Sequence, residues 1–195
     1  MIAWLDLSKP LLWTVDDVLG RDECAALIER IEAAGCSPAP ITTGAGFVMR
    51  PDVRNNTRVI IDDEALAADL FERVASRVPV DVAGWTVAGA NERLRGYRYE
   101  RGQRFAPHYD GAFERGPTEV SRLTFLIYLN DDFAGGSTDF PELGERITPR
   151  TGMALFFQHR ILHEGCAVTS GVKYVLRSDV MYRAPDESRA RARGG

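Results

Sequence analysis

The sequence predicts a mainly β protein of the α+β class, a double-stranded β-helix (jelly roll) with N-terminal helices packed on one sheet. Two segments with the apolar spacing of amphipathic helices lie in the first 84 residues. Later in the chain, short apolar segments are separated by turns that contain Gly and Pro, which is typical of antiparallel strands. Many short strands after two helices favour two packed sheets with helices on one face.

Length and composition are typical of one globular domain. The chain has 195 residues, enough to bury a core without disulfides or metals. We expect a single domain over residues 1–184, with a helical part at 1–84 and a jelly-roll core at 85–184. Residues 185–195 alternate Arg and Ala and end in Gly-Gly, so we expect a flexible tail.

Charge and cysteine content restrict the partners and the location of the protein. The net charge of -4 argues against nucleic acid, because phosphate binding usually leaves a basic footprint. The three cysteines show no paired spacing, which predicts reduced thiols in a cytoplasmic protein. No basic N-terminal region precedes an apolar run, and no apolar stretch approaches the ~18 residues of a membrane helix, so neither a signal peptide nor a membrane partner is expected.

The first elements are an edge strand and a helix. Residues 1–15 combine Trp and Leu with Pro10, and we expect a short edge strand there. A helix follows, and its end is predicted at Gly35, because Gly adopts the backbone conformation that terminates helices. Its apolar stripe consists of Cys24, Leu27, Ile28 and Ile31.

A loop, a strand and a second helix come next. Residues 36–57 are rich in Pro, Gly, Thr and Asn, which predicts a loop with at most one short strand. Residues 58–61 predict a short strand. Either Asp62 or Asp63 can cap the second helix, because its carboxylate accepts hydrogen bonds from free amides of the first turn. The apolar stripe of this helix consists of Leu66, Leu70, Phe71 and Val74.

Five segments predict the strands of the jelly roll. Residues 93–99 alternate, whereas residues 123–129 are almost continuously apolar, so we expect both faces of that strand to be covered. Segments 135–140, 153–157 and 174–182 complete the series.

Two of the three histidines stand in a pattern typical of metal sites. His108 and Asp110 are two residues apart, so in a strand they point to the same face. His163 supplies a second imidazole later in the chain, and His159 is the alternative. Two histidines and one carboxylate, with the other positions open, form the metal site of non-haem Fe(II) oxygenases. The His-x-Asp pattern alone is more often structural.

Blocks of sequence surround these residues in a fixed order. The first, residues 99–110, follows the pattern Tyr-x-x-Gly-Gln-x-aromatic-x-x-His-x-Asp. The others are residues 123–130 with 135–140, 149–157 and 163–173. Together they resemble the 2-oxoglutarate- and Fe(II)-dependent dioxygenases, specifically the prolyl-4-hydroxylase-like branch. The resemblance covers roughly residues 92–182, about half of the chain.

The resemblance implies a role for each site residue. The implied iron ligands are His108, Asp110 and His163. Lys173 would pair with the distal carboxylate of 2-oxoglutarate, and Tyr99 would donate a hydrogen bond to it. A dianion that chelates a metal at one end needs a cation and donors at the other. A buried lysine without a partner is unfavourable, so a bound carboxylate is a sensible partner for it. The alternative for Lys173 is a solvated strand residue.

Three further residues are candidates for the cosubstrate site. Arg177 lies four residues after Lys173, on the same strand face, and could replace or assist that lysine or bind substrate. Arg122 and Thr124 are weaker candidates.

The resemblance also implies a reaction. It is the hydroxylation of an unactivated C–H bond in a protein side chain such as proline, a peptide or a free amino-acid-like substrate, with release of succinate and CO2. The implied cofactors are Fe(II), 2-oxoglutarate and O2, with ascorbate as a candidate reductant. Related halogenating enzymes lack the carboxylate, so with Asp110 present the resemblance implies hydroxylation or a related oxidation. The alternatives are a nucleic-acid demethylase of the same superfamily and a non-catalytic jelly-roll binding module.

Two polar segments are candidates for the substrate entrance. Loop 111–121 contains two glycines and a proline beside the predicted metal, which predicts a lid or a plain hairpin connection. We expect Arg54, Asn55 or Arg58 to contact substrate, and the alternative is a solvated loop. The aromatic residues expected in the core are Tyr97 and Trp85.

Overall fold

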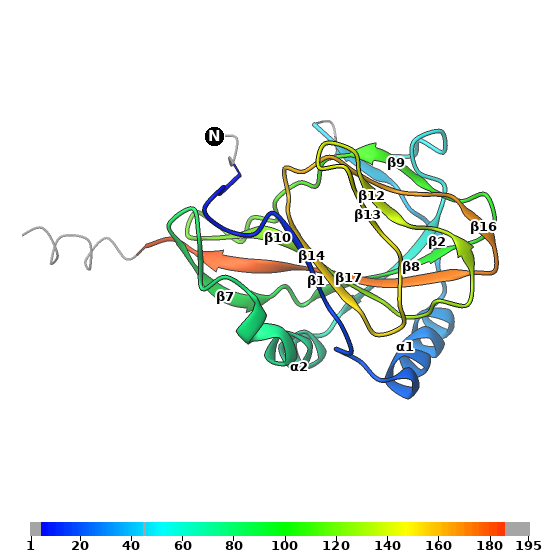
Figure 1. Ribbon diagram of the computed structural model, residues 1–195, viewed down its shortest axis with the longest axis horizontal. Helices are drawn as coiled ribbons and strands as arrows, with labels where there is room; N and C mark the ends of the chain where they lie inside the picture. The colour runs from blue at the N-terminus through cyan, green and yellow to red at the C-terminus, as the bar shows by residue number, and fades with distance from the viewer. Residues whose placement is uncertain (1–4, 45, 186–195) are drawn as a thin grey trace, which may run out of the picture.

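The computed structural model describes residues 5–44 and 46–185, and two antiparallel sheets dominate them (Figure 1). The main sheet contains, in spatial order, β1 (Leu12–Val15), β14 (Ala154–Gln158), β10 (Glu119–Tyr128), β17 (Lys173–Arg183), β8 (Arg93–Tyr99), β5 (Thr57–Asp62) and β2 (Ser37–Pro38), and also β7 (Trp85–Ala90) paired with β17 and β6 (Asp81–Val82) paired with β7. The second sheet contains β13 (Glu145–Ile147), β12 (Thr138–Phe140), β15 (His163–Gly165) and β9 (Phe105–His108). Two small pairs join β11 (Ala134–Gly135) to β16 (Val168–Ser170), and β3 (Ile41–Thr43) to β4 (Gly46–Val48).

Each central strand of the main sheet contributes to two apolar cores, because successive side chains point to opposite faces. On β10, Leu123 and Phe125 pack on the helical side, whereas Leu126 and Tyr128 pack toward the second sheet. Every residue from 123 to 129 is buried, so the prediction that both faces of this strand are covered is confirmed. The pocket described below opens within the second of these cores.

The helices cover the outer face of the main sheet. They are α1 (Arg21–Ala34) and α2 (Glu64–Val74), followed by the short 3-10 helix η1 (Ala75–Arg77), and α1 and α2 lie on the same side of the sheet (Figure 1). Asp63 caps the N-terminus of helix α2, and its carboxylate accepts a hydrogen bond of 2.9 Å from the Leu66 amide. Helix α1 ends at Gly35, where φ is 78°. Both helix boundaries agree with the sequence prediction.

The predicted jelly roll with helices on one sheet is confirmed, and so is the edge strand, which is β1 at the border of the main sheet. The prediction for residues 36–57 was wrong, because this segment contains β2, β3 and β4. Their side chains are mostly exposed, so they carry no apolar periodicity. Strand β7 was also not predicted.

The ends of the chain add two observations. Residues 1–4 of the predicted edge segment and residues 186–195 of the predicted tail lie outside the described residues. Among the residues described, neither helix has the length and apolar character needed to cross a membrane.

Candidate metal centre and adjoining pocket

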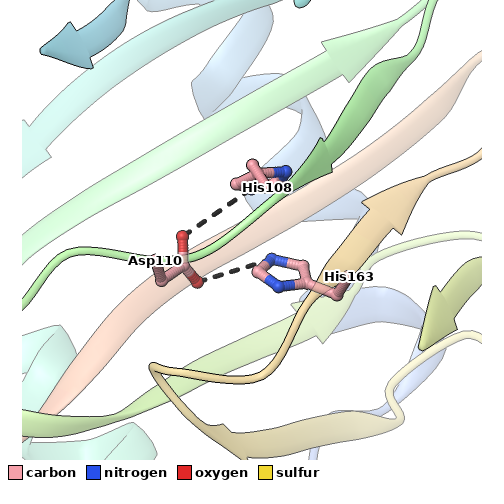
Figure 2. Close-up of side chains that lie close together, drawn as sticks. All are labelled: His108, Asp110 and His163. Atoms are coloured by element: carbon pink, nitrogen blue, oxygen red, sulfur yellow. Dashed lines mark ion pairs between the residues drawn. The ribbon is translucent and has the colours of Figure 1, made fainter. Parts of the chain in front are cut away.

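Three side chains from two neighbouring strands converge at one end of the second sheet (Figure 2). His108 is the last residue of β9, and it stands opposite His163, the first residue of β15. Asp110 lies just beyond β9, where its amide donates to the carbonyl of His159 at 3.1 Å. Antiparallel pairing therefore brings together two histidines that are far apart in sequence.

The spacing of the donor atoms suits a divalent metal. Asp110 lies 3.8 Å from Nε2 of His108 through Oδ1 and 3.6 Å from Nε2 of His163 through Oδ2. The donor atoms of all three residues lie within 4.8 Å of one another. Both histidines also have Nδ1 close to a backbone carbonyl, at 2.8 Å for His108 and 3.0 Å for His163. If each Nδ1 donates its proton there, each Nε2 lone pair is free for a metal.

The charge states of these residues also fit metal binding. Burial lowers the pKa of His108 to about 4 and also lowers the pKa of His163, so both imidazoles are neutral at pH 7. Burial alone would raise the pKa of Asp110, but the guanidinium of Arg177 and, to a smaller degree, the neighbouring histidines together outweigh it and hold that pKa well below its usual range. Two neutral imidazoles and one carboxylate are the donor set of the 2-His-1-carboxylate centres of Fe(II).

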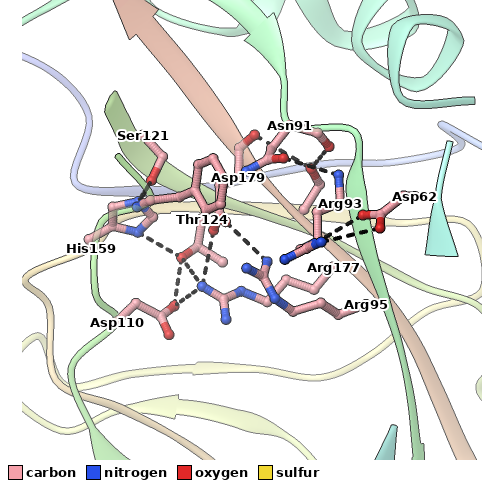
Figure 3. Close-up of polar contacts among 12 residues, drawn as sticks. Asp62, Asn91, Arg93, Arg95, Asp110, Ser121, Thr124, His159, Arg177 and Asp179 are labelled. Carbon is pink, nitrogen blue, oxygen red and sulfur yellow. Dashed lines mark hydrogen bonds and ion pairs between the residues drawn. The ribbon is translucent and has the colours of Figure 1, made fainter. Parts of the chain in front are cut away.

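The carboxylate of Asp110 is held by a polar network (Figure 3). Its Oδ2 accepts a hydrogen bond of 2.6 Å from Thr124 and forms an ion pair of 3.1 Å with Arg177. The same Thr124 hydroxyl lies 3.1 Å from Nδ1 of His159, whose Nε2 lies 2.8 Å from Ser121. With both ring nitrogens engaged, His159 lies outside the metal cluster, so the alternative that it is the second imidazole ligand is not supported.

Asp179 is a second anchor for the buried arginines. It is almost fully buried and pairs with Arg177 and Arg95, each at 3.1 Å. The sequence analysis did not single out Asp179. Its spacing of two residues from Arg177 on one strand was the available signal, because such residues share a face.

A pocket extends from the metal cluster between the two sheets. Its lining includes both predicted metal-binding histidines and Asp110, together with Tyr97, Tyr99, Thr124, Tyr128, Lys173 and Arg177. Lys173 and Arg177 both point inward from β17, and four strand residues place their Cα atoms roughly 13 Å apart. Arg177 contacts Asp110 at the metal end of the pocket, so Lys173 lies in the part of the pocket away from the metal cluster.

Lys173 is a buried cation, so the alternative of a solvated strand residue is excluded. Only 3% of its surface is exposed. Its ammonium donates to the carbonyl of Gly136 at 2.5 Å and lies 5.5 Å from the ring centre of Tyr99. No carboxylate of the described residues pairs with it, and burial lowers its pKa to about 7. A bound anion would relieve this unfavourable burial.

Other predicted residues lie in different surroundings. Tyr97 is buried in the core between the sheets, as expected, and also lines the pocket, and Thr124 lines the pocket close to Asp110. Arg122 lies elsewhere, with its guanidinium 4.6 Å from the ring centre of Trp85.

A wider cleft lies outside the pocket and shares several of its walls. Arg54 and Arg58 line it, as do residues 111–113 of the loop after Asp110. Asn55 is not among the residues that line this cleft. Its side chain instead accepts a hydrogen bond of 2.7 Å from the Arg104 amide. Arg54 is buried, so the solvated loop that was the alternative does not describe it.

A second cluster of potential metal donors consists of Asp139, Glu164 and Cys166. Arg146 donates to both carboxylate oxygens of Asp139, to Oδ1 at 3.0 Å and to Oδ2 at 2.5 Å. This cluster is therefore an ion-paired group on the outside of the second sheet rather than a free donor set.

Comparison with known proteins shows similarity to one family of enzymes. The model of the 2OG-Fe(II) oxygenase superfamily matches residues 94–178. The prolyl 4-hydroxylase subunit alpha-2 of Gallus gallus is 35% identical over 130 residues, which cover 58% of this chain and 23% of that subunit. A putative prolyl 4-hydroxylase of Acanthamoeba polyphaga mimivirus is 31% identical over 147 residues, covering 64% of this chain and 57% of the viral protein. The chain thus spans less than two thirds of the length of both relatives.

The fold is also similar to solved structures. The viral collagen prolyl hydroxylase of Paramecium Bursaria Chlorella virus-1, in its 2OG complex, superimposes with a TM-score of 0.62 at 20% identity. The match covers 89% of this chain and 97% of the viral enzyme. At this identity the likeness supports the fold, and the jelly roll is the shared architecture.

Proposed function

Because residues 94–178 form a domain of the 2OG-Fe(II) oxygenase superfamily, in its prolyl-4-hydroxylase-like branch, we propose that this protein is a 2-oxoglutarate- and Fe(II)-dependent hydroxylase. The observation that carries the proposal is one pocket that contains both a 2-His-1-carboxylate donor set and a buried lysine, which has no ion-pair partner within residues 5–44 and 46–185. The first feature suits Fe(II) and the second suits a carboxylate.

His108, Asp110 and His163 would hold the iron through two Nε2 atoms and one carboxylate oxygen. When bound, Fe(II), 2-oxoglutarate and O2 supply the oxidising power that replaces a C–H bond by C–OH, with release of succinate and CO2. Asp110 is charged and held in place by Arg177 and Thr124, so the ligand is oriented before the metal arrives.

Lys173 would bind the distal carboxylate of 2-oxoglutarate. Its ammonium is buried and lacks a carboxylate partner among the described residues, whereas Arg177 already pairs with both Asp110 and Asp179. This difference supports Lys173 over Arg177 as the cosubstrate cation. Tyr99 lines the same pocket, and its hydroxyl would donate to the same carboxylate.

The proposed substrate is a prolyl residue of a peptide or protein, or a related free amino acid, as the names of the relatives suggest. It would enter through the cleft that adjoins the pocket. The apolar walls of the pocket, including Leu126 and Phe157, would exclude water from the reacting carbon.

An anaerobic titration tests the proposal. Fe(II) and 2-oxoglutarate are added to the purified protein, and the weak visible charge-transfer band of the chelate is recorded. We expect a band in the wild type, no band in His108→Ala, and a band that requires roughly 10- to 100-fold more 2-oxoglutarate in Lys173→Ala, since a charge-assisted pair is lost.

The chain offers a matched control. Its only other lysine is Lys9, which pairs with Asp81 away from the pocket, so Lys9→Ala should titrate like the wild type. Absence of the band in a wild type that binds iron would refute the cosubstrate assignment. Absence of iron binding would favour a non-catalytic module.

A further inference from the structure

The cleft outside the pocket concentrates positive charge in an acidic protein. The chain has a net charge of -4. The charged residues lining the cleft are Arg54, Arg58, Arg93, Arg95, Arg160 and Arg177, against Asp110 and Asp179. The arginines therefore outnumber the carboxylates where the proposed substrate would lie.

Half of these arginines already have partners. Arg95 and Arg177 pair with the two aspartates of the cleft, and Arg93 pairs with Asp62 at 3.0 Å. The remaining three are Arg54, Arg58 and Arg160, and within residues 5–44 and 46–185 none of them forms an ion pair. The cleft therefore has cations available for a ligand.

Arg54 is the most informative of these cations, because it is buried and incompletely paired. Only 4% of its surface is exposed, and its Nε donates to Asn56 at 2.8 Å. Its Nη2 is buried and has no hydrogen-bond partner among the described residues. A buried guanidinium donor without an acceptor is unfavourable, which points to an acceptor supplied by a ligand.

Aromatic contacts fix Arg54 beside the metal cluster. Its guanidinium carbon lies 4.3 Å from the ring centre of Phe105 and 4.6 Å from that of Tyr97. Phe105 in turn stacks on His108, with 3.4 Å between ring centres. A ligand group on Arg54 would therefore lie close to the proposed iron site.

The arginines of the cleft also affect the phenol of Tyr97. Burial alone would raise the pKa of Tyr97, but the nearby Arg54, Arg177 and Arg95 outweigh it and lower the pKa to about 7. This wall of the cleft therefore favours negative charge.

We propose that the cleft binds a carboxylate of the substrate through Arg54 and Arg58, so that the oxidised group belongs to an acidic, amino-acid-like molecule. The inference rests on the proposed hydroxylase function and adds the chemical class of its substrate. A guanidinium matches a carboxylate with two parallel hydrogen bonds. The carboxylate is either that of a free amino acid or that of an acidic residue next to the target in a peptide.

The rest of the lining favours such a molecule over nucleic acid. Apolar side chains also line the cleft, among them Ile41, Phe47, Ile60 and Phe113. Protein–nucleic acid interfaces are instead strongly polar and basic over a wide surface. An apolar cleft with a buried guanidinium suits one compact anion attached to a hydrocarbon body.

The test compares acids with neutral isosteres by calorimetry, on protein loaded anaerobically with Fe(II) and 2-oxoglutarate. One pair is L-proline and L-prolinamide. The other pair is N-acetylated, C-amidated Ala-Ala-Glu-Pro-Ala-Ala and its Gln analogue. We expect the acid of at least one pair to bind roughly 10- to 100-fold more tightly than its isostere, and the responding pair identifies the source of the carboxylate.

Variants assign the effect to the arginines. Arg58→Gln, at a half-buried position, should remove most of the preference, and Arg54→Gln should remove it while Arg54→Lys retains part of it. Arg101→Gln removes the same charge from an exposed position outside the cleft and should leave the preference intact. Thermal unfolding of each variant identifies any that fail to fold. If the variants of the buried Arg54 fail to fold, the acid preference of Arg58→Gln decides the test.

Several outcomes would overturn the proposal. These are equal affinity within both pairs, no measurable binding of any probe, and preferential binding of a single-stranded oligonucleotide. Failure of the hydroxylase function is a separate result, seen as absence of the chelate band. An acid preference without that band would support the cleft assignment and refute the proposed reaction.

Discussion

Lys173 is a buried ammonium whose charge depends on pH near neutrality. Burial lowers its pKa to about 7 in the ligand-free protein, against 10.5 in an exposed lysine. Below pH 7 the group is already protonated and ready for a carboxylate. Above pH 7 binding must also take up a proton, because the bound carboxylate raises the pKa again. We therefore expect the affinity for 2-oxoglutarate to be constant below pH 7 and to fall up to roughly tenfold per pH unit above it.

Anaerobic titrations of the Fe(II)-loaded protein with 2-oxoglutarate from pH 6 to pH 9 measure this dependence. Lys173→Arg is the control, because a guanidinium stays charged over this range and should give a flat profile. A flat profile in the wild type would show that Lys173 does not supply the charge.

Thr124 lies between the proposed ligand Asp110 and the buried imidazole of His159. Its hydroxyl lies 2.6 Å from Asp110 and 3.1 Å from His159. Thr124→Val keeps the shape but removes both contacts, so Asp110 loses part of its orientation. We expect Fe(II) to bind roughly 10- to 100-fold more weakly, as when other residues that orient a metal ligand are changed, and Thr124→Ser to behave like the wild type. Unchanged Fe(II) affinity in Thr124→Val, measured by metal titration, would contradict this role.

At the scale of single residues, sequence spacing predicted the neighbours that lie close along the chain. The pair His108 and Asp110 is an example, because strand geometry alone puts both on one face. The ion pair of Arg177 with Asp110 could not be predicted, since Asp110 follows a strand of the other sheet. Arg54 was expected on a polar loop for the same reason: its burial depends on Phe105, which pairs with it from β9.

At the scale of elements, Gly96 sets the distance between α1 and β8. A Cβ at this position would lie 2.6 Å from Cγ1 and 2.9 Å from Cδ1 of Ile31, a fully buried side chain of α1. We expect Gly96→Ala to lower the free energy of unfolding by about 1–3 kcal/mol through overpacking. Gly44→Ala is the control, because no atom lies within 4 Å of its added Cβ. Chemical denaturation of both variants checks this, and equal stability would show that α1 moves away without loss.

The elements themselves were largely predictable, whereas their pairing was not. Apolar periodicity and a capping aspartate predicted both helices, because these signals lie within one segment. The pairing of β9 with β15, which puts His163 opposite His108, joins segments more than fifty residues apart. No local pattern encodes such a contact. The hairpin of β3 and β4 was missed because Phe47 and its neighbours are exposed and follow no apolar period.

At the scale of the whole molecule, stability and chemistry occupy different layers. The core between the helices and the main sheet consists of apolar side chains, such as Ile31, Leu70 and Phe125. The layer between the two sheets holds the buried charges Asp110, Lys173 and Arg177 as well as apolar residues. The helical layer can therefore stabilise the fold while the other layer carries incompletely paired charges.

This division predicts that ligands stabilise the molecule through the pocket layer. The proposed metal joins β9 to β15, and 2-oxoglutarate would join the metal to Lys173 on β17, so both bind only the folded chain. At about 100 times its dissociation constant a ligand adds about 2.7 kcal/mol, which raises Tm by roughly 5–10 °C for a chain of this size. Anaerobic thermal unfolding with Fe(II), and then with Fe(II) and 2-oxoglutarate, should show two successive increases. His108→Ala should lose both, and Lys173→Ala only the second. A full increase with Fe(II) in His108→Ala would place the metal elsewhere, with the cluster around Asp139 as the next site to test.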